Sequence, residues 1–183
     1  MGRAMRPWPS ITYQWGSTTA ERAGEFACDT LLEEPDDTLF RAIDVAAPAA
    51  SLFRWLCQLR AAPYSYDRLD NGGRQSPRTL TPGLEELAVG QRVMRIFRLV
   101  HYEPGRSITI LCRGRLMGAV ACTYEVRPVA EQRCRLVVKM LLEYRGAPAP
   151  LMRLVMPPGD LVMIRRQMLN LKELAEAGSG PAG

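Results

Sequence analysis

The chain has 183 residues, of which 47% are apolar and 23% charged, and it carries a formal net charge of +5. This length suits one domain with a sizeable core, and the composition is that of a folded globular protein. The sequence has no apolar run of about 18 residues, which excludes a transmembrane helix and any stable membrane insertion.

The positive charge is almost all arginine, and it is scattered along the chain rather than clustered. Most of these arginines alternate with apolar residues, as on the solvated face of a sheet. No recognition helix or aromatic RNA-binding pattern accompanies them. We therefore expect no nucleic-acid partner, because a basic balance alone does not define one.

The cysteines and the single histidine limit the chemistry. The five cysteines are odd in number, widely spaced and free of any C-x-x-C pair, so we expect reduced thiols in the cytoplasm. His101 is the only histidine and lies beside a turn, where a solvated role is favoured over catalysis. No metal site or cofactor is expected, and the lack of a G-x-S-x-G motif speaks against a hydrolase.

The N-terminal segment predicts a short helix and two anchors. A helix over Thr19–Gly24 is expected, with Ser17 or Thr18 as its N-terminal cap. Trp15 and Phe26 are expected to hold this segment on the surface of the domain. The first 15 residues lack the continuous apolar run of a secretory signal.

The first core elements are a strand and two helices. Asp37–Val45 reads as a strand and Pro48–Leu59 as a helix, since proline suits the first helical position. A second short helix is expected over Tyr64–Asp70. Arg74–Gly90 then reads as a long loop, and loops of this length often bind ligands or act as lids.

Four further strands follow with short connections, which favours antiparallel hairpins. Their expected ranges are Arg92–Val100, Arg106–Arg113, Ala119–Arg127 and Arg133–Tyr144. In the last of these, the even-numbered residues 134–144 form a dry face and the odd-numbered residues 133–143 a wet one. This alternation predicts an antiparallel sheet that is covered on one side only.

The C-terminal region predicts the cover. Pro148–Met156 reads as a short helix or a buried turn, and Pro157-Pro158-Gly159 is expected to break the chain. Asp160 is then expected to cap an amphipathic helix over Leu161–Glu176.

These elements predict an α+β container, in which a curved antiparallel sheet wraps around a long C-terminal helix and two short helices follow the first strand. The expected organisation is a surface-packed extension over residues 1–36, the domain over 37–177 and a disordered tail over 178–183.

Three segments carry a family resemblance: AAPYSYDRLDN from Ala61, TPGLEELAVGQRV from Thr81 and GDLVMIRRQMLNLKELAE from Gly159. They resemble the SRPBCC group of START-like proteins, the helix-grip superfamily that includes aromatic polyketide cyclases, lipid-transfer domains and pollen allergens. The chain is more narrowly similar to bacterial members with a W-G-x-T segment, here beginning at Trp15. The resemblance implies a cavity between the concave sheet and the last helix. Typical relatives have Trp where this chain has Arg68, and this departure leads us to expect a more polar rim here.

Tyr64, Tyr66 and Asp67 are the candidate catalytic residues. On one helix, Asp67 lies three residues from both Tyr64 and Asp70, so these three would share a side. A tyrosine hydroxyl beside a carboxylate is a possible general acid. The structural alternative is a pair of packed tyrosines with an aspartate at a helix end.

Arg95 and Arg98 would lie on opposite faces of the strand Arg92–Val100. An unpaired buried charge is costly, so an inward arginine needs a carboxylate, a ligand anion or several carbonyls. Arg95 shares the more apolar face and is the better candidate for the cavity, while the alternative is an edge strand with both arginines in water. Glu125 is expected on the outside.

The expected ligand-binding residues combine aromatic side chains, one arginine and adaptable methionines. They are Trp55, Arg95, Phe97, Tyr124, Met140, Met156, Met163 and Met168. For the methionines, ordinary core packing is the alternative.

Three functions fit these observations. The first is the binding of a hydrophobic small molecule of lipid, polyketide or isoprenoid type. The second is a polyketide cyclase or dehydratase that uses the cavity as a folding template. The third is a membrane-surface protein using Arg153, Arg165 and Arg166, which ranks last because the apolar stripe of the same helix is needed to close the core. The sequence does not specify the ligand or the oligomeric state.

Overall fold

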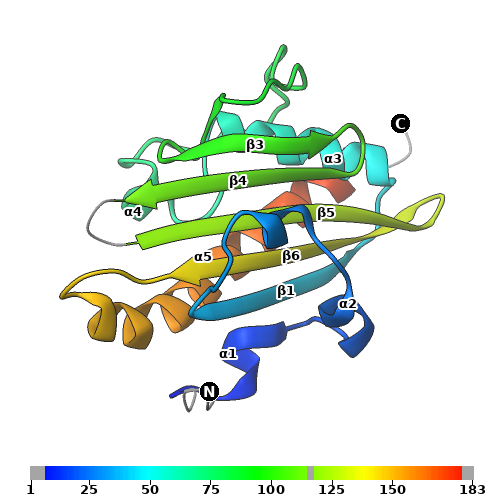
Figure 1. The fold of residues 1–183 in the computed structure, drawn as a ribbon. Coiled ribbons are helices and arrows are strands. Elements are labelled where there is room, and N and C mark those ends of the chain that lie inside the picture. Colours follow the sequence, from blue (N-terminus) through cyan, green and yellow to red (C-terminus); the bar gives the residue numbers. More distant parts are fainter. Residues whose placement is uncertain (1–6, 115–117, 179–183) are drawn as a thin grey trace.

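Six strands form one antiparallel sheet with the order β1-β6-β5-β4-β3-β2 (Figure 1). The structure is a computed structural model, and it describes residues 7–114 and 118–178. The strands are β1 Asp37–Val45, β2 Arg92–Val93, β3 Phe97–Glu103, β4 Ser107–Gly114, β5 Gly118–Ala130 and β6 Arg133–Glu143. The first strand pairs with the last, and the remaining neighbours are hairpin partners in the order of the chain.

Two helices, α3 Ala49–Cys57 and α5 Ala149–Ala177, pack on one face of the sheet, and residues 26–32 of the N-terminal segment cover part of the other (Figure 1). The α-helices are α1 Ser10–Gln14, α2 Thr19–Ala23, α3 Ala49–Cys57, α4 Asp67–Asp70 and α5 Ala149–Ala177, and the 3₁₀ helices are η1 Ala27–Thr30 and η2 Gln58–Arg60. The predicted α+β container is confirmed in this arrangement. Most of the expected tail and part of the turn before β5 lie outside the described residues.

The C-terminal helix α5 is continuous over 29 residues, so the predicted break at Pro157-Pro158-Gly159 is wrong. Pro158 has no N–H to donate to the carbonyl oxygen four residues before it, which is that of Leu154. The indole Nε1 of Trp8 donates to this oxygen at 2.8 Å instead. The N-terminal segment thereby satisfies an acceptor that the proline leaves free, and Asp160 becomes an interior residue of the helix rather than its cap.

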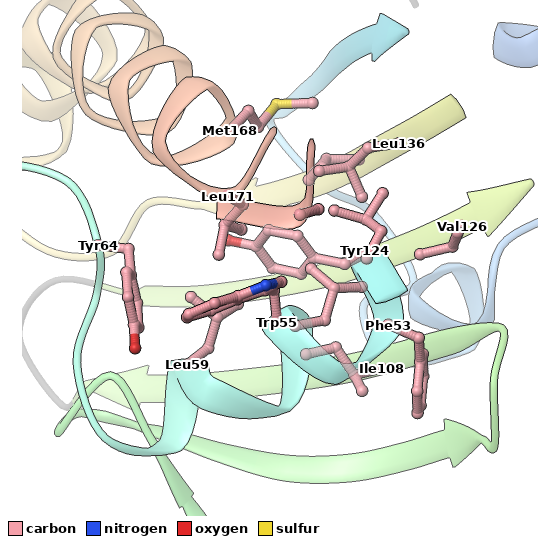
Figure 2. Close-up of a cluster of buried hydrophobic side chains, with 14 of the residues drawn as sticks. Phe53, Trp55, Leu59, Tyr64, Ile108, Tyr124, Val126, Leu136, Met168 and Leu171 are labelled. Atoms are coloured by element: carbon pink, nitrogen blue, oxygen red, sulfur yellow. The ribbon is translucent and has the colours of Figure 1, made fainter. Parts of the chain in front are cut away.

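The main core lies between the concave face of the sheet and the helices α3 and α5. Tyr124 of β5 projects from the sheet into this cluster, between Trp55 of α3 and Leu171 of α5 (Figure 2). The dry face predicted for the last strand is confirmed, since Leu136 and Val138 are buried here. Alternation along each strand sends every second side chain to this core.

The opposite face of the sheet is also covered, which corrects the predicted wet face of β6. Val137 and Leu141 are buried there under Phe26, Cys28 and Leu32 of the N-terminal segment. Figure 1 shows this segment crossing the sheet between α2 and β1. Two charged residues of this face are paired with the N-terminal segment, Lys139 with Asp29 and Arg135 with Glu21, so two-sided burial coexists with an alternating sequence.

The Trp15-Gly16-Ser17-Thr18 segment fastens the N-terminus to β1. Trp15 bridges to Arg41 in the parallel sense, and Gly16 adopts a φ of +72° directly against Ala42. A Cβ on Gly16 would lie 2.0 Å from the carbonyl oxygen of Ala42. Thr18 then caps α2 in a capping box with Glu21, as predicted.

Gly16→Ala should destabilise the protein by about 1–3 kcal/mol more than Gly105→Ala does, because only the first adds a steric overlap. Both glycines have positive φ, so both variants share a left-handed backbone cost of about 1–2 kcal/mol. A Cβ on Gly105 meets no atom within 4 Å. Urea denaturation measures both variants, and equal losses would show that the segment does not depend on this close approach.

Candidate functional site

A pocket of about 550 Å³ lies between the concave face of the sheet and α5. Its floor comes from β3 to β6 and its roof from α5, and its mouth lies beside α4 and the turn between β2 and β3. The floor residues are Phe97, Ile110, Cys122, Tyr124 and Met140, and the roof residues are Asp160, Met163, Ile164 and Gln167. The lining is therefore mainly apolar, with a few polar groups on its inner walls.

A turn that the sequence pattern did not predict shapes the mouth of the pocket. Met94 and Arg95 have φ values of +45° and +66°, so the predicted strand Arg92–Val100 is divided into β2 and β3. Arg95 is exposed at the mouth of the pocket, and Arg98 is exposed and donates to the carbonyl of Gly90 at 3.0 Å. The expectation that they occupy opposite faces of one strand is therefore wrong, and both arginines reach water, which was the alternative left open.

Tyr124 and Gln167 join the floor of the pocket to its roof. The Tyr124 hydroxyl donates to Gln167 Oε1 at 2.8 Å, and Gln167 Nε2 donates to the carbonyl of Pro63 at 2.6 Å and to Met94 Sδ at 3.1 Å. Burial raises the pKa of Tyr124 well above its usual value, so the hydroxyl stays protonated. This network fixes the side chains on one wall of the pocket.

A buried ion pair joins the first strand to α5 on the same side of the sheet. Arg41 is 1% exposed, and its Nη2 donates to Asp160 Oδ2 at 2.7 Å while its Nη1 donates to the carbonyl of Phe40 at 2.9 Å. Asp160 lines the pocket, and its side chain is 10% exposed. Burial raises the pKa of Asp160 to about 6 even though Arg41 opposes the shift, and burial lowers the pKa of Arg41.

The sequence carries a signal for this pair. Arg41 alternates with Leu39, Ile43 and Val45, so the strand pattern itself places a charge on the dry face. Asp160 follows Pro157-Pro158-Gly159, and this context favoured a helix cap instead. An arginine on the dry face of a strand indicates a buried carboxylate partner, because an unpaired buried charge is costly.

Five of the eight expected ligand-binding residues line the pocket: Arg95, Phe97, Tyr124, Met140 and Met163. The other three belong to packed clusters. Trp55 and Met168 are buried in the main core, and Met156 packs beside Tyr13, Leu39, Leu142 and Tyr144. Met156 and Met168 therefore follow the alternative stated for the methionines, which is ordinary core packing.

The expected catalytic residues lie outside this pocket. Helix α4 begins only at Asp67, and Tyr64 precedes it with a φ of +56°, so the shared helix face is wrong. Tyr64 and Asp67 line a separate hollow of about 280 Å³, and Tyr66 is exposed. The Asp67 carboxylate accepts from the backbone N–H and hydroxyl of Ser76, at 2.9 and 2.6 Å.

Tyr64 packs as a core residue. Its ring meets Trp55 edge to face with centroids 6.1 Å apart, at the border of the cluster in Figure 2. Burial, with a smaller effect of the Asp67 charge, raises the pKa of Tyr64 to about 12. Glu125 lies on the outer face, as predicted, and there it is paired with Arg106 and Arg127.

Within residues 7–114 and 118–178, no helix combines the length and apolarity needed to cross a lipid bilayer. In the same residues, no group of three or more His, Cys, Asp or Glu side chains is arranged to hold a metal ion.

The comparison with protein-family models gives no match, and neither does the comparison with curated proteins. Solved structures do match. The di-domain ARO/CYC protein BexL from the BE-7585A biosynthetic pathway is 14% identical with a TM-score of 0.51, over 79% of this chain and 48% of that one. This chain thus spans about half the length of BexL.

Two further structures show weaker overlap. DynU16, from the dynemicin biosynthetic locus, is 17% identical with a TM-score of 0.49, over 79% of this chain and 49% of that one. A START superfamily protein from Mycobacterium smegmatis is 15% identical with a TM-score of 0.45, over 78% of this chain and 96% of that one. At these identities the likeness concerns the fold. The helix-grip fold expected from the sequence is confirmed by the six-stranded antiparallel sheet and the long helix α5.

Arg41→Met should lose about 3–5 kcal/mol of stability at pH 8, because it leaves the Asp160 carboxylate buried without its counter-charge. A carboxyl whose folded pKa lies above its unfolded value binds more protons when folded, so stability falls as pH rises through that window. Without Arg41 the pKa of Asp160 rises further, and the loss should shrink towards pH 5 as the carboxyl becomes protonated.

The control is the double variant Arg41→Met with Asp160→Leu, which should show neither the loss nor its dependence on pH. Guanidinium denaturation at pH 5 and pH 8 measures both variants. A single-variant loss that is equally large at both pH values would contradict the pairing.

Proposed function

We propose that this protein binds an apolar small molecule of lipid, polyketide or isoprenoid type in the pocket beneath α5. The observation that carries the proposal is the pocket itself, a mainly apolar hollow of about 550 Å³ with an open mouth. Small-molecule sites commonly have volumes of roughly 300–1,000 Å³, apolar linings and a few polar groups that orient the ligand.

The mouth supports entry of an apolar molecule. Leu69 and Ile96 border it and are 77% and 68% exposed, although each is a large apolar side chain. Met163 and Met140 lie further in and are half-buried. Methionine adapts its shape to varied neighbours, which suits a wall that meets different ligand shapes.

Met163→Trp should weaken binding of the uncharged probe N-phenyl-1-naphthylamine at least ten-fold, because the indole would occupy the pocket. Leu169→Trp is the matched control, since Leu169 is an exposed residue of the same helix outside the lining. Probe fluorescence gives both dissociation constants. Equal binding by the two variants, or no binding by the unsubstituted protein, would contradict the proposed site.

A second candidate function is that of a cyclase or dehydratase acting on a polyketide-like chain. The specific observation in its favour is Asp160, a pocket carboxyl whose pKa burial raises to about 6. A general base is most effective when its pKa lies near the working pH. The similarity to an ARO/CYC protein adds a precedent for this fold and no more.

The second candidate predicts a rate. Heptane-2,4,6-trione closes to a phenol by intramolecular aldol addition and loss of one water, and the protein should accelerate this reaction while Asp160→Asn should not. Liquid chromatography with mass detection follows the loss of water. A rate equal to that of buffer would leave binding as the function.

We also propose a reducing, cytoplasmic setting. All five cysteines are free thiols. Cys112 is half-buried, and the other four are buried. Burial raises the pKa of Cys57 to about 12 and that of Cys134 to about 11, which keeps both thiols protonated and unreactive.

A further inference from the structure

The Arg41–Asp160 pair is not accounted for by stability. Two apolar side chains of similar volume are often as stabilising as a buried ion pair, or more so. Here burial raises the pKa of Asp160 although Arg41 is 2.7 Å away, so removal from water outweighs the attraction. A charge kept in an apolar wall at such a cost is typical of a functional group.

The position of Asp160 gives the charge a use. Arg41 is enclosed between β1 and α5 with a side chain only 2% exposed, whereas Asp160 reaches the pocket surface. The guanidinium therefore lies behind the carboxylate as seen from the pocket. A molecule in the pocket meets the carboxylate and not the guanidinium.

The other polar groups on the inner walls are already engaged as donors. Both N–H groups of Gln167 donate, to the carbonyl of Pro63 and to Met94 Sδ, and Gln167 Oε1 accepts from Tyr124. The Tyr124 proton is committed to that bond, which leaves its oxygen as an acceptor. Cys122, whose thiol burial keeps protonated by raising its pKa, is at most a weak donor.

The inner wall thus offers acceptors, a carboxylate and a phenolic oxygen, while Arg95, the charged donor of the described lining, is exposed at the mouth. A ligand carboxylate or phosphate placed there would face the like charge of Asp160 and find little to bind it. A ligand hydroxyl would find a charged acceptor in a dry site, where such hydrogen bonds are strong.

We propose that Asp160 sets the specificity of the pocket by accepting a hydrogen bond from the hydroxyl group of an otherwise apolar ligand. The inference rests on the proposed binding function and adds the chemical class of the ligand, an apolar alcohol or phenol. Arg41 positions the carboxylate through the bond to Asp160 Oδ2 and contributes no group of its own to the ligand.

Equilibrium dialysis at pH 7.5 with naphthalene, 2-naphthol and 2-naphthoate tests the inference, because the three probes share a ring system and differ in one group. The expected order of affinity is 2-naphthol above naphthalene above 2-naphthoate. The ratio of the naphthalene to the 2-naphthol dissociation constant should be ten or more.

Asp160→Asn should reduce this ratio below three. The amide oxygen of the variant would accept from Arg41, so the ligand hydroxyl would meet an NH₂ group in place of a charged acceptor. The double variant Arg41→Met with Asp160→Leu should do the same, and it keeps the test usable if the single variant folds poorly. Glu173→Gln is the matched control: it makes the same chemical change on the same helix, at an exposed residue paired with Arg78. The ratio in this control should equal that of the unsubstituted protein.

The outcomes separate the two proposals. If no probe binds with a dissociation constant below 1 mM, both the binding function and this inference are overturned. If naphthalene binds but 2-naphthol is no tighter, or if the ratio persists in both Asp160 variants, only the inference fails. Tightest binding of 2-naphthoate would also overturn it, by showing that the pocket prefers an anion.

Discussion

The unbroken course of α5 across the concave face of the sheet is the constraint on which this structure depends. A helix that began only at Leu161 would leave Asp160, which lines the roof of the pocket, at a helix terminus. Where the helix passes through its two prolines, the Leu154 carbonyl that Pro158 leaves free accepts from the Trp8 indole. It is held over the sheet by Arg41 from β1 and by the contact between Gln167 and Tyr124.

These tethers also explain why a hollow persists. Leu171 and Met168 pack tightly against the sheet further along the helix, while near Asp160 and Met163 the roof stands away from the floor. The turn at Met94 and Arg95 ends β2 at the mouth instead of extending it across the opening. The pocket therefore results from the contacts that hold α5 over the sheet and from the turn at its mouth.

Strand alternation and helix periodicity were enough to predict the α+β container, because each is a local consequence of burying one face. The features that could not be predicted, the continuity of α5 and the turn before β3, depend on contacts between residues far apart in the sequence. Pro157 and Pro158 indicate a break locally, whereas the indole that binds the carbonyl left free by Pro158 lies 146 positions before that carbonyl. Met94 and Arg95 have positive φ although neither is glycine, so the sequence does not indicate a turn there.

The prediction of the site was correct for residues placed by strand alternation and wrong for residues placed on an assumed helix. Phe97, Tyr124 and Met140 follow from strand alternation and do line the pocket, whereas the group of Tyr64, Tyr66 and Asp67 relied on a helix that starts three residues too late. Arg41 shows that a charge on a dry strand face is as informative as any motif. Its partner could be identified only once the helix was known to be continuous.

A crystal structure with 6-bromo-2-naphthol can show whether the space beneath α5 holds an apolar molecule, as we propose. We expect an anomalous bromine peak between Ile110 of the floor and Ile164 of the roof. If the protein's own side chains fill this space, or if bromine is found only on the outer face of α5, the proposed binding site is wrong.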